Sequence, residues 1–86
     1  MLVKWSDRFK KCFDVMSKEA KKVSERKLAL FADNPRHPSL RSKRVQGTNS
    51  IWESTVNKST RFTWEYIEGG VKLRAIGEHD KVLSNP

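Results

Sequence analysis

IWESTVNKSTRFTWEYIEGGVKLRAIGEHD, residues 51–80, decides the fold of this 86-residue chain. Within it, residues 51–57, 61–66 and 71–76 form short runs rich in β-branched and aromatic side chains, and turn-like segments separate them. This spacing predicts three antiparallel strands. Gly69 and Gly70 both tolerate positive φ, so we expect a two-residue hairpin loop there, with Glu68 opposite Val71.

The register of that hairpin predicts which side chains share a face of the sheet. Counting back from the loop places Glu65 opposite Arg74 and Arg61 opposite Glu78. One face then carries the apolar side chains, which are Phe62, Trp64, Tyr66, Leu73 and Ala75. The other face carries mostly polar ones, which are Arg61, Thr63, Glu65, Lys72 and Arg74. We expect the apolar face to be core and the polar face to be available for binding or chemistry.

The composition of the chain favours a polyanionic partner. A length of 86 residues predicts a single domain, residues 1–86, with one small core. The formal net charge is +8, and residues 35–50 contain four Lys or Arg and no acid. Nucleic acid is favoured over a membrane surface, because no basic helix with a strongly apolar face accompanies this charge.

Targeting features are lacking in the sequence. The first residues contain no apolar stretch of signal-peptide length, and one cysteine cannot form an intrachain disulfide, so we expect a cytoplasmic protein. The longest apolar run, residues 28–32, is far shorter than the ~20 residues that span a bilayer. No membrane span is therefore expected.

The first 34 residues predict a strand followed by two helices. Residues 2–5 alternate weakly and suggest an edge strand, and Ser6 is a good N-cap for a helix whose apolar stripe begins at Phe9. Ser17 is a second N-cap, for a helix that runs to about Phe31 or Ala32. The Asn34-Pro35 pair ends it, because the residue before proline is pushed out of the helical region. We expect the two helices to form a hairpin.

Residues 34–50 are expected to be mostly loop, with two prolines and one glycine. Leu40 and Val45 are the expected buried anchors of this segment. A short strand at about residues 41–46 would add to the sheet. Arg41, Lys43 and Arg44 would project beside it.

The chemistry that these residues support is metal-free. The sequence lacks the patterns of a metal site, a P-loop, a dinucleotide fingerprint and a nucleophile elbow, so we expect neither metal nor cofactor. A metal-free ribonuclease needs a base, a cation for the phosphorane and an acid for the leaving oxygen. Glu53 or a histidine would be the base, Arg61 the cation and His79 the acid. The alternative is an ordinary Glu/Arg pair across a solvated sheet.

The predicted elements are a strand, two helices, a basic loop (residues 34–50) and a three-stranded meander (residues 51–76). This order resembles the RelE/ParE superfamily of type II toxin–antitoxin toxins. The resemblance covers nearly the whole chain. It rests on Asn34-Pro35, Pro38-Ser39-Leu40, Val45-Gln46-Gly47, Ile51-Trp52-Glu53, Arg61-Phe62 and Ile76-Gly77-Glu78-His79-Asp80. It implies an α+β, RelE-like fold, with an N-terminal strand and a two-helix hairpin packed on a small antiparallel sheet.

The resemblance to RelE-type members implies a ribosome-dependent mRNA endoribonuclease that inhibits translation and is silenced by a cognate antitoxin protein. Arg61 is similar to the arginine that such members use on the phosphate, and Glu53 and His79 stand where further catalytic groups occur. Expected RNA-binding residues are Arg41, Lys43, Arg44, Lys58 and Arg74. Alternatives are a ParE-like gyrase inhibitor and a noncatalytic RNA-binding relative.

Three features depart from the pattern of the family. Thr55 and Thr60 occupy positions where the resemblance implies a basic residue and an aromatic residue or histidine. These differences favour an attenuated enzyme or one with a different target. The sequence also ends at Pro86, and no C-terminal helix of the kind found in some members is expected.

Overall fold

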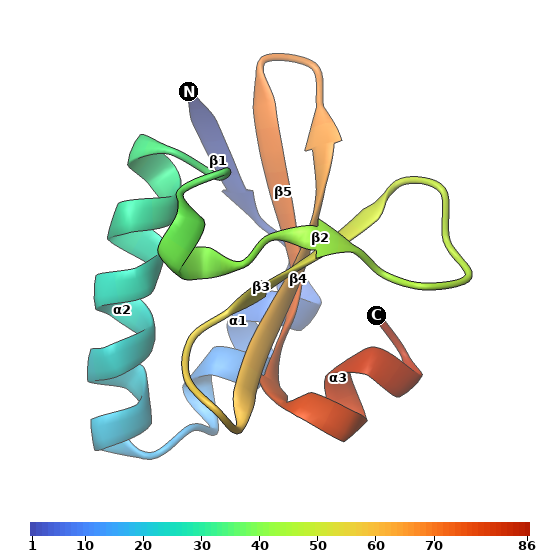
Figure 1. Ribbon diagram of the computed structural model, residues 1–86. Helices are drawn as coiled ribbons and strands as arrows, with labels where there is room; N and C mark the ends of the chain where they lie inside the picture. Colours follow the sequence, from blue (N-terminus) through green and yellow to red (C-terminus); the bar gives the residue numbers. More distant parts are fainter.

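A computed structural model describes all 86 residues and shows an α+β architecture of three helices, one 3₁₀ turn and a five-stranded sheet (Figure 1). In chain order the elements are β1 (Leu2–Trp5), α1 (Asp7–Asp14), α2 (Lys18–Asp33), the 3₁₀ turn η1 (Pro38–Leu40), β2 (Lys43–Arg44), β3 (Ile51–Thr55), β4 (Thr60–Ile67), β5 (Gly70–Glu78) and α3 (His79–Ser84). The three predicted strands, the N-terminal strand and the two predicted helices are confirmed.

The strand order in the sheet is β1-β5-β4-β3-β2. Neighbours from β5 to β2 run antiparallel, as predicted for the meander, whereas β1 runs parallel to β5. The sheet is therefore mixed, and the expectation of a purely antiparallel sheet was wrong at this edge. The cause is the connection from β1 to β5, which passes through the helices and the rest of the sheet instead of a hairpin.

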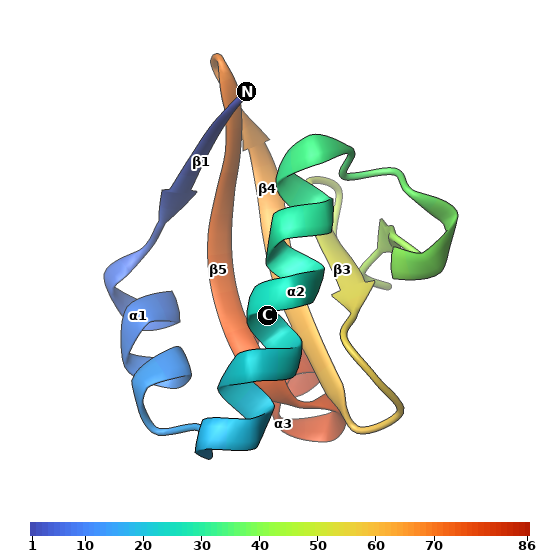
Figure 2. The same cartoon turned by 90° about the vertical axis from the view of Figure 1, so that its left-hand side faces the viewer.

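The helices lie on opposite faces of the sheet. In Figure 2, α2 crosses in front of the sheet and α3 lies behind it. Both predicted N-caps form, because the Ser6 and Ser17 hydroxyls accept hydrogen bonds from Phe9 N and Ala20 N at 3.0 and 3.1 Å. The main core lies under α1 and α2 and consists of Phe9, Phe31, Leu40, Val56, Phe62, Trp64, Val71, Leu73 and Ile76. The other face of the sheet, under α3, carries mostly polar side chains, among them Glu53, Arg61 and Thr63.

The basic loop is anchored to the core by its two predicted apolar residues. Leu40 is fully buried and Val45 is 5% exposed. Ser42 Oγ adds a polar anchor, since it lies 2.7 Å from both Pro35 O and Ser54 Oγ. Ser54 Oγ in turn accepts a hydrogen bond from the buried Trp64 Nε1 at 2.9 Å. The loop therefore has a defined position beside β3.

The β4–β5 hairpin differs from its predicted register. Ile67 pairs with Gly70, so the loop consists of Glu68 and Gly69, one residue earlier than expected. Gly69 alone takes positive φ there, at 82°. Gly70 is needed for a different reason, because a Cβ at this position would lie 1.9 Å from Leu2 O of the adjacent β1. Gly69 is thus required by the turn, and Gly70 is required by the close approach of the β1 backbone.

A β-bulge at Arg74 changes the register again along β5. Trp64 pairs with Leu73, but Thr63 pairs with Ala75, so Arg74 has no partner on β4. Arg61 therefore lies opposite Gly77, and the predicted pairing with Glu78 is wrong. Ala75 pairs with Thr63 and lies on the face under α3, so its predicted place on the apolar face was wrong. Tyr66, also predicted for the core, remains 52% exposed.

The segment after β5 forms the helix α3, contrary to the expectation that no C-terminal helix would be present. Glu78 is its N-cap, and its Oε1 accepts a hydrogen bond from Asp80 N at 3.1 Å. Val82 is buried against the sheet, and Pro86 O accepts hydrogen bonds from Thr63 Oγ1 and Arg74 Nε. None of the three helices combines the length and apolarity needed to cross a bilayer.

Candidate active site

The three predicted catalytic residues line one hollow on the face of the sheet under α3. This hollow, called here the Arg61 hollow, has a volume of about 270 Å³. Its lining residues are Arg41, Lys43, Glu53, Thr55, Arg61 and His79. Three cations thus surround one carboxylate and one imidazole, which makes the hollow suited to an anion.

Glu53 and Arg61 share this face because of the β3–β4 register. Glu53 pairs with Thr63, and Thr55 pairs with Arg61, so the odd-numbered residues of both strands project to the same side. Glu53 is only 6% exposed, yet its carboxylate forms no ion pair in the protein. A carboxylate at the wall of a cationic hollow, free of any ion-pair partner, is available to accept a proton.

Arg61 is held by the turn between β3 and β4 and not by a carboxylate. Its Nη1 donates hydrogen bonds to Asn57 O at 2.5 Å and to Lys58 O at 3.3 Å. The other guanidinium nitrogens have no hydrogen-bond acceptor in the protein. The simple cross-strand pair with Glu78 therefore does not form, and Arg61 keeps donors free for a bound anion.

His79 begins α3 and is tied to the same turn. Its backbone N–H donates to Ser59 O at 2.7 Å, and its Nδ1 lies 3.0 Å from Asp80 Oδ1. The side chain is 43% exposed, and Nε2 has no partner in the protein. An aspartate at Nδ1 orients the imidazole, so that Nε2 is the nitrogen free to exchange a proton with a ligand.

Arg41 and Lys43 enter the hollow from the basic loop. Arg41 follows η1 with a left-handed backbone, at φ 48° and ψ 45°, which redirects the chain into β2. Lys43 pairs directly with Glu53 across β2 and β3. Two of the predicted RNA-binding cations thus lie beside the predicted catalytic residues, at positions suited to flanking phosphates.

The other three predicted RNA-binding residues lie outside the Arg61 hollow. Arg44 points to the opposite face of the sheet, where its guanidinium lies 5.6 Å from the Trp52 ring centroid. Lys58 is exposed in the β3–β4 turn. Arg74 forms an ion pair of 2.5 Å with Glu65 and also bonds Pro86 O. Neighbouring residues on a strand alternate between faces, which separates Arg44 from Lys43.

The turn that positions Arg61 and His79 was not identified from the sequence as part of the site. Asn57 Oδ1 accepts hydrogen bonds from Ser59 N and Thr60 N, both at 3.0 Å. The carbonyls of residues 57–59 are thereby directed toward Arg61 and toward the start of α3. The spacing of Asn57 and Ser59 is the signal that could have revealed it, because asparagine favours turns that its own side chain closes.

Comparisons with known proteins agree with this arrangement at the level of the fold. No protein-family model matches the sequence, and no curated protein matches it significantly. A chain of the E. coli DinJ–YafQ toxin–antitoxin complex matches with a TM-score of 0.77 and 13% identity, over 94% of each chain. The YoeB/ParE toxin from Agrobacterium tumefaciens matches with a TM-score of 0.76 and 10% identity, over 92% of this chain and 99% of that chain.

A chain of the intact E. coli RelBE toxin–antitoxin complex matches with a TM-score of 0.70 and 15% identity, over 91% of this chain and 95% of that chain. The protein has the RelE/ParE toxin fold. The fold predicted by resemblance is therefore confirmed. One fold supports several activities, so the fold alone does not assign an activity to this protein.

Proposed function

We propose that this protein is the toxin of a type II toxin–antitoxin pair and cleaves ribosome-bound mRNA without a metal ion. One observation carries the proposal: Glu53, Arg61 and His79 line a single hollow with two further cations. A base, a charge stabiliser and an acid are the groups that metal-free RNA cleavage requires. The RelE/ParE fold of the chain supports the same reading.

In the proposed reaction the substrate supplies its own nucleophile. Glu53 removes the proton of a ribose 2′-OH, and O2′ attacks the adjacent phosphorus. Arg61 stabilises the negative charge of the phosphorane through its free guanidinium N–H groups. The bond from phosphorus to O5′ breaks, and protonated His79 gives its proton to O5′. The products are a 2′,3′-cyclic phosphate and a 5′-hydroxyl end.

Arg41 and Lys43 are proposed to bind the phosphates that flank the cut. Both are cations at the wall of the Arg61 hollow, and the loop that carries them is anchored by Leu40 and Ser42. Thr55 lines the same hollow in the place of the expected basic residue. One cation fewer at this wall is consistent with an attenuated enzyme that depends on the ribosome for part of its substrate affinity.

A cognate antitoxin protein is the second proposed partner. Two of the similar solved structures are toxin–antitoxin complexes. A chain with net charge +8 and a cationic hollow offers an acidic segment a complementary surface. We propose that such a segment covers the face under α3 in the cytoplasm and so blocks the access of RNA.

Induction of the protein in growing cells tests the proposed function. We expect protein synthesis to stop and mRNAs to acquire discrete 2′,3′-cyclic phosphate ends, while chromosomal DNA stays intact. Glu53→Gln should abolish the new ends, whereas Glu25→Gln, the same change at an exposed position of α2, should not. DNA breaks with intact mRNA would instead identify a ParE-like gyrase inhibitor. Translation arrest without new ends would identify a noncatalytic RNA-binding relative.

A further inference from the structure

A second and larger hollow adjoins the Arg61 hollow. It has a volume of about 490 Å³ and is called here the Gln46 hollow. Its lining residues are Lys43, Arg44, Val45, Gln46, Glu53 and Leu83. Lys43 and Glu53 line both hollows, so that a ligand bound at one hollow can extend directly into the other.

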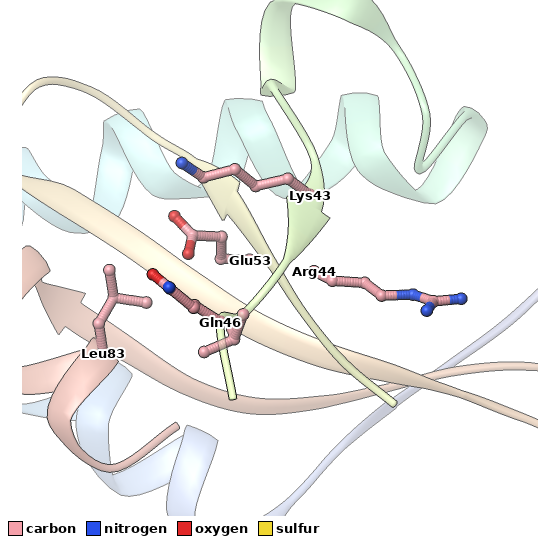
Figure 3. A pocket seen from close by; sticks show the side chains of 6 residues that line it. Lys43, Arg44, Gln46, Glu53 and Leu83 are labelled. Atoms are coloured by element: carbon pink, nitrogen blue, oxygen red, sulfur yellow. The ribbon is translucent and has the colours of Figure 1, made fainter. Parts of the chain in front are cut away.

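Both polar and apolar side chains line the Gln46 hollow. In Figure 3, the side chains of Lys43, Gln46 and Glu53 project to the same side, and Leu83 approaches from α3. Arg44 points away from them, toward Trp52. The hollow thus offers an amide with both donor and acceptor atoms next to an apolar wall, a combination suited to a flat heterocycle.

Gln46 is presented by an ordered loop while its side chain is unpartnered within the protein. Val45 N donates to Ile51 O at 2.8 Å, and Thr48 Oγ1 donates to Val45 O at 2.8 Å. These two bonds fix the backbone of Val45, the residue before Gln46, to Thr48 and Ile51 on the other side of the loop. The amide is exposed, so it can hydrogen-bond a ligand without first breaking a bond in the protein.

We infer that the Gln46 hollow binds the base of the nucleotide on the 5′ side of the cut, and that Gln46 reads this base as adenine. The inference rests on the proposed function. If Glu53 takes the 2′-OH proton and the phosphate lies with Arg61, the ribose lies at Glu53. Its base then lies on the side of Glu53 away from Arg61, which is where the Gln46 hollow is.

The choice of adenine follows from hydrogen-bond chemistry. A glutamine amide pairs with the N6 donor and N7 acceptor of adenine through two parallel hydrogen bonds. With the edge that carries N7 in purines turned to Gln46, guanine presents only acceptors, cytosine only a donor and uracil only an acceptor. Adenine is the one base that pairs there with both groups of the amide. Leu83, which is only partly buried, provides apolar surface for the face of the ring.

Ribosomes programmed with four mRNAs that differ only in the base 5′ of the cut provide the test. The wild-type protein should cut the adenine mRNA about tenfold faster than the others, the size of one bidentate base contact. Gln46→Ala should slow cleavage of the adenine mRNA to about the rate of the other three and so remove the preference. Asn49→Ala removes a side-chain amide from an exposed position of the same loop and should keep the preference.

The outcomes separate this inference from the proposed function. A preference for adenine that survives Gln46→Ala, or an equal loss of rate on all four mRNAs, would overturn the base assignment but leave the cleavage reaction standing. If the wild-type protein cuts no mRNA, the proposed function fails. Adenosine 3′-monophosphate should still shift the NMR signals of the Gln46 amide and Leu83 methyls more than uridine 3′-monophosphate does. Equal or absent shifts would overturn the subsite itself.

Discussion

The face of the sheet under α3 carries a glutamate and an arginine at each of its two ends, and the two ends are built differently. Near the β4–β5 turn, Glu65 and Arg74 form an ion pair of 2.5 Å. At the opposite end, Glu53 and Arg61 line one hollow without forming an ion pair. The same residue types therefore have a structural partner at one end and none at the other.

Under the proposed function, this difference predicts where the protein gives up stability for activity. A half-exposed ion pair contributes little, about 0–1 kcal/mol, but it satisfies the charges that form it. Glu53 and Arg61 have no ion-pair partner in the protein, so their charges are free to interact with a ligand. The contrast predicts large effects on activity at the Arg61 hollow and small effects on stability at the pair of Glu65 and Arg74.

Substitution of His79 should give the largest effect. His79→Ala removes the proposed acid and should lower the rate of mRNA cleavage by about 10² to 10⁴, the range for one acid or base. Single-turnover cleavage on programmed ribosomes measures this change. His37→Ala, at a partly buried histidine of the basic loop outside the hollow, is the matched control and should retain activity. Equal activity of the two variants would remove His79 from the mechanism.

Substitution of Arg61 should come next. Arg61→Ala should lower the cleavage rate by about 10² to 10³, as expected for the loss of one donor to a developing anion. Arg61→Lys keeps the charge but loses the planar fork, so it should recover only part of the rate. Thermal unfolding on the same proteins checks that the turn at residues 57–59 is preserved. A folded Arg61→Ala protein with full activity would contradict the catalytic assignment.

The cations of the basic loop should affect binding more than chemistry. A protein with Arg41→Gln and Lys43→Gln should bind programmed ribosomes more weakly. The slope of log K against log[salt] should flatten by about 0.7 for each phosphate of single-stranded RNA that the variant fails to neutralise. Lys18→Gln and Lys22→Gln, exposed on α2, remove the same charge elsewhere. If both double variants flatten the slope equally, net charge and not the hollow explains the binding.

The smallest effect is expected at the paired end of the face. Arg74→Ala removes the ion pair with Glu65 and the hydrogen bond to Pro86 O, and it should lower the free energy of unfolding by about 1 kcal/mol or less. Urea unfolding measures this loss. The cleavage rate should change far less than in Arg61→Ala. A loss of activity as large as that of Arg61→Ala would show that both ends of the face serve the reaction.

Local patterns in the sequence predicted most of the elements and the residues proposed for the candidate site. Alternating β-branched and aromatic residues identified the strands, and Ser6 and Ser17 identified the helix starts, because strand periodicity and N-capping depend on near neighbours. Glu53, Arg61 and His79 were selected by residue type, because each can supply one group that metal-free RNA cleavage requires. Leu40 and Val45 were recognisable as anchors because they are isolated apolar residues in a polar loop.

Contacts between distant segments decided the rest. Gly70 is required by the backbone of β1, at the other end of the chain, and no local pattern reveals that contact. The bulge at Arg74 directs the Arg74 carbonyl to the hydroxyl of Ser6 at 3.1 Å, and it shifts every later pairing of β5 by one residue. The earlier turn alone would pair Arg61 with Ile76, and the bulge moves this pairing one residue along, to Gly77. The sequence-based register, which had neither feature, was therefore wrong by one residue at Arg61.

Near-neighbour patterns in the chain were enough to predict the order of elements from β1 to β5, the basic loop and the residue types that the proposed metal-free cleavage needs. Tertiary packing was required to decide that α3 forms, that Glu78 caps it, and that His79 meets Arg61 at one hollow. A helix of six residues is too short to be stable from its own sequence. It forms because Val82 packs on the sheet and because Thr63 and Arg74 hydrogen-bond Pro86 O just after it. The Arg61 hollow is complete only after this long-range packing has placed His79.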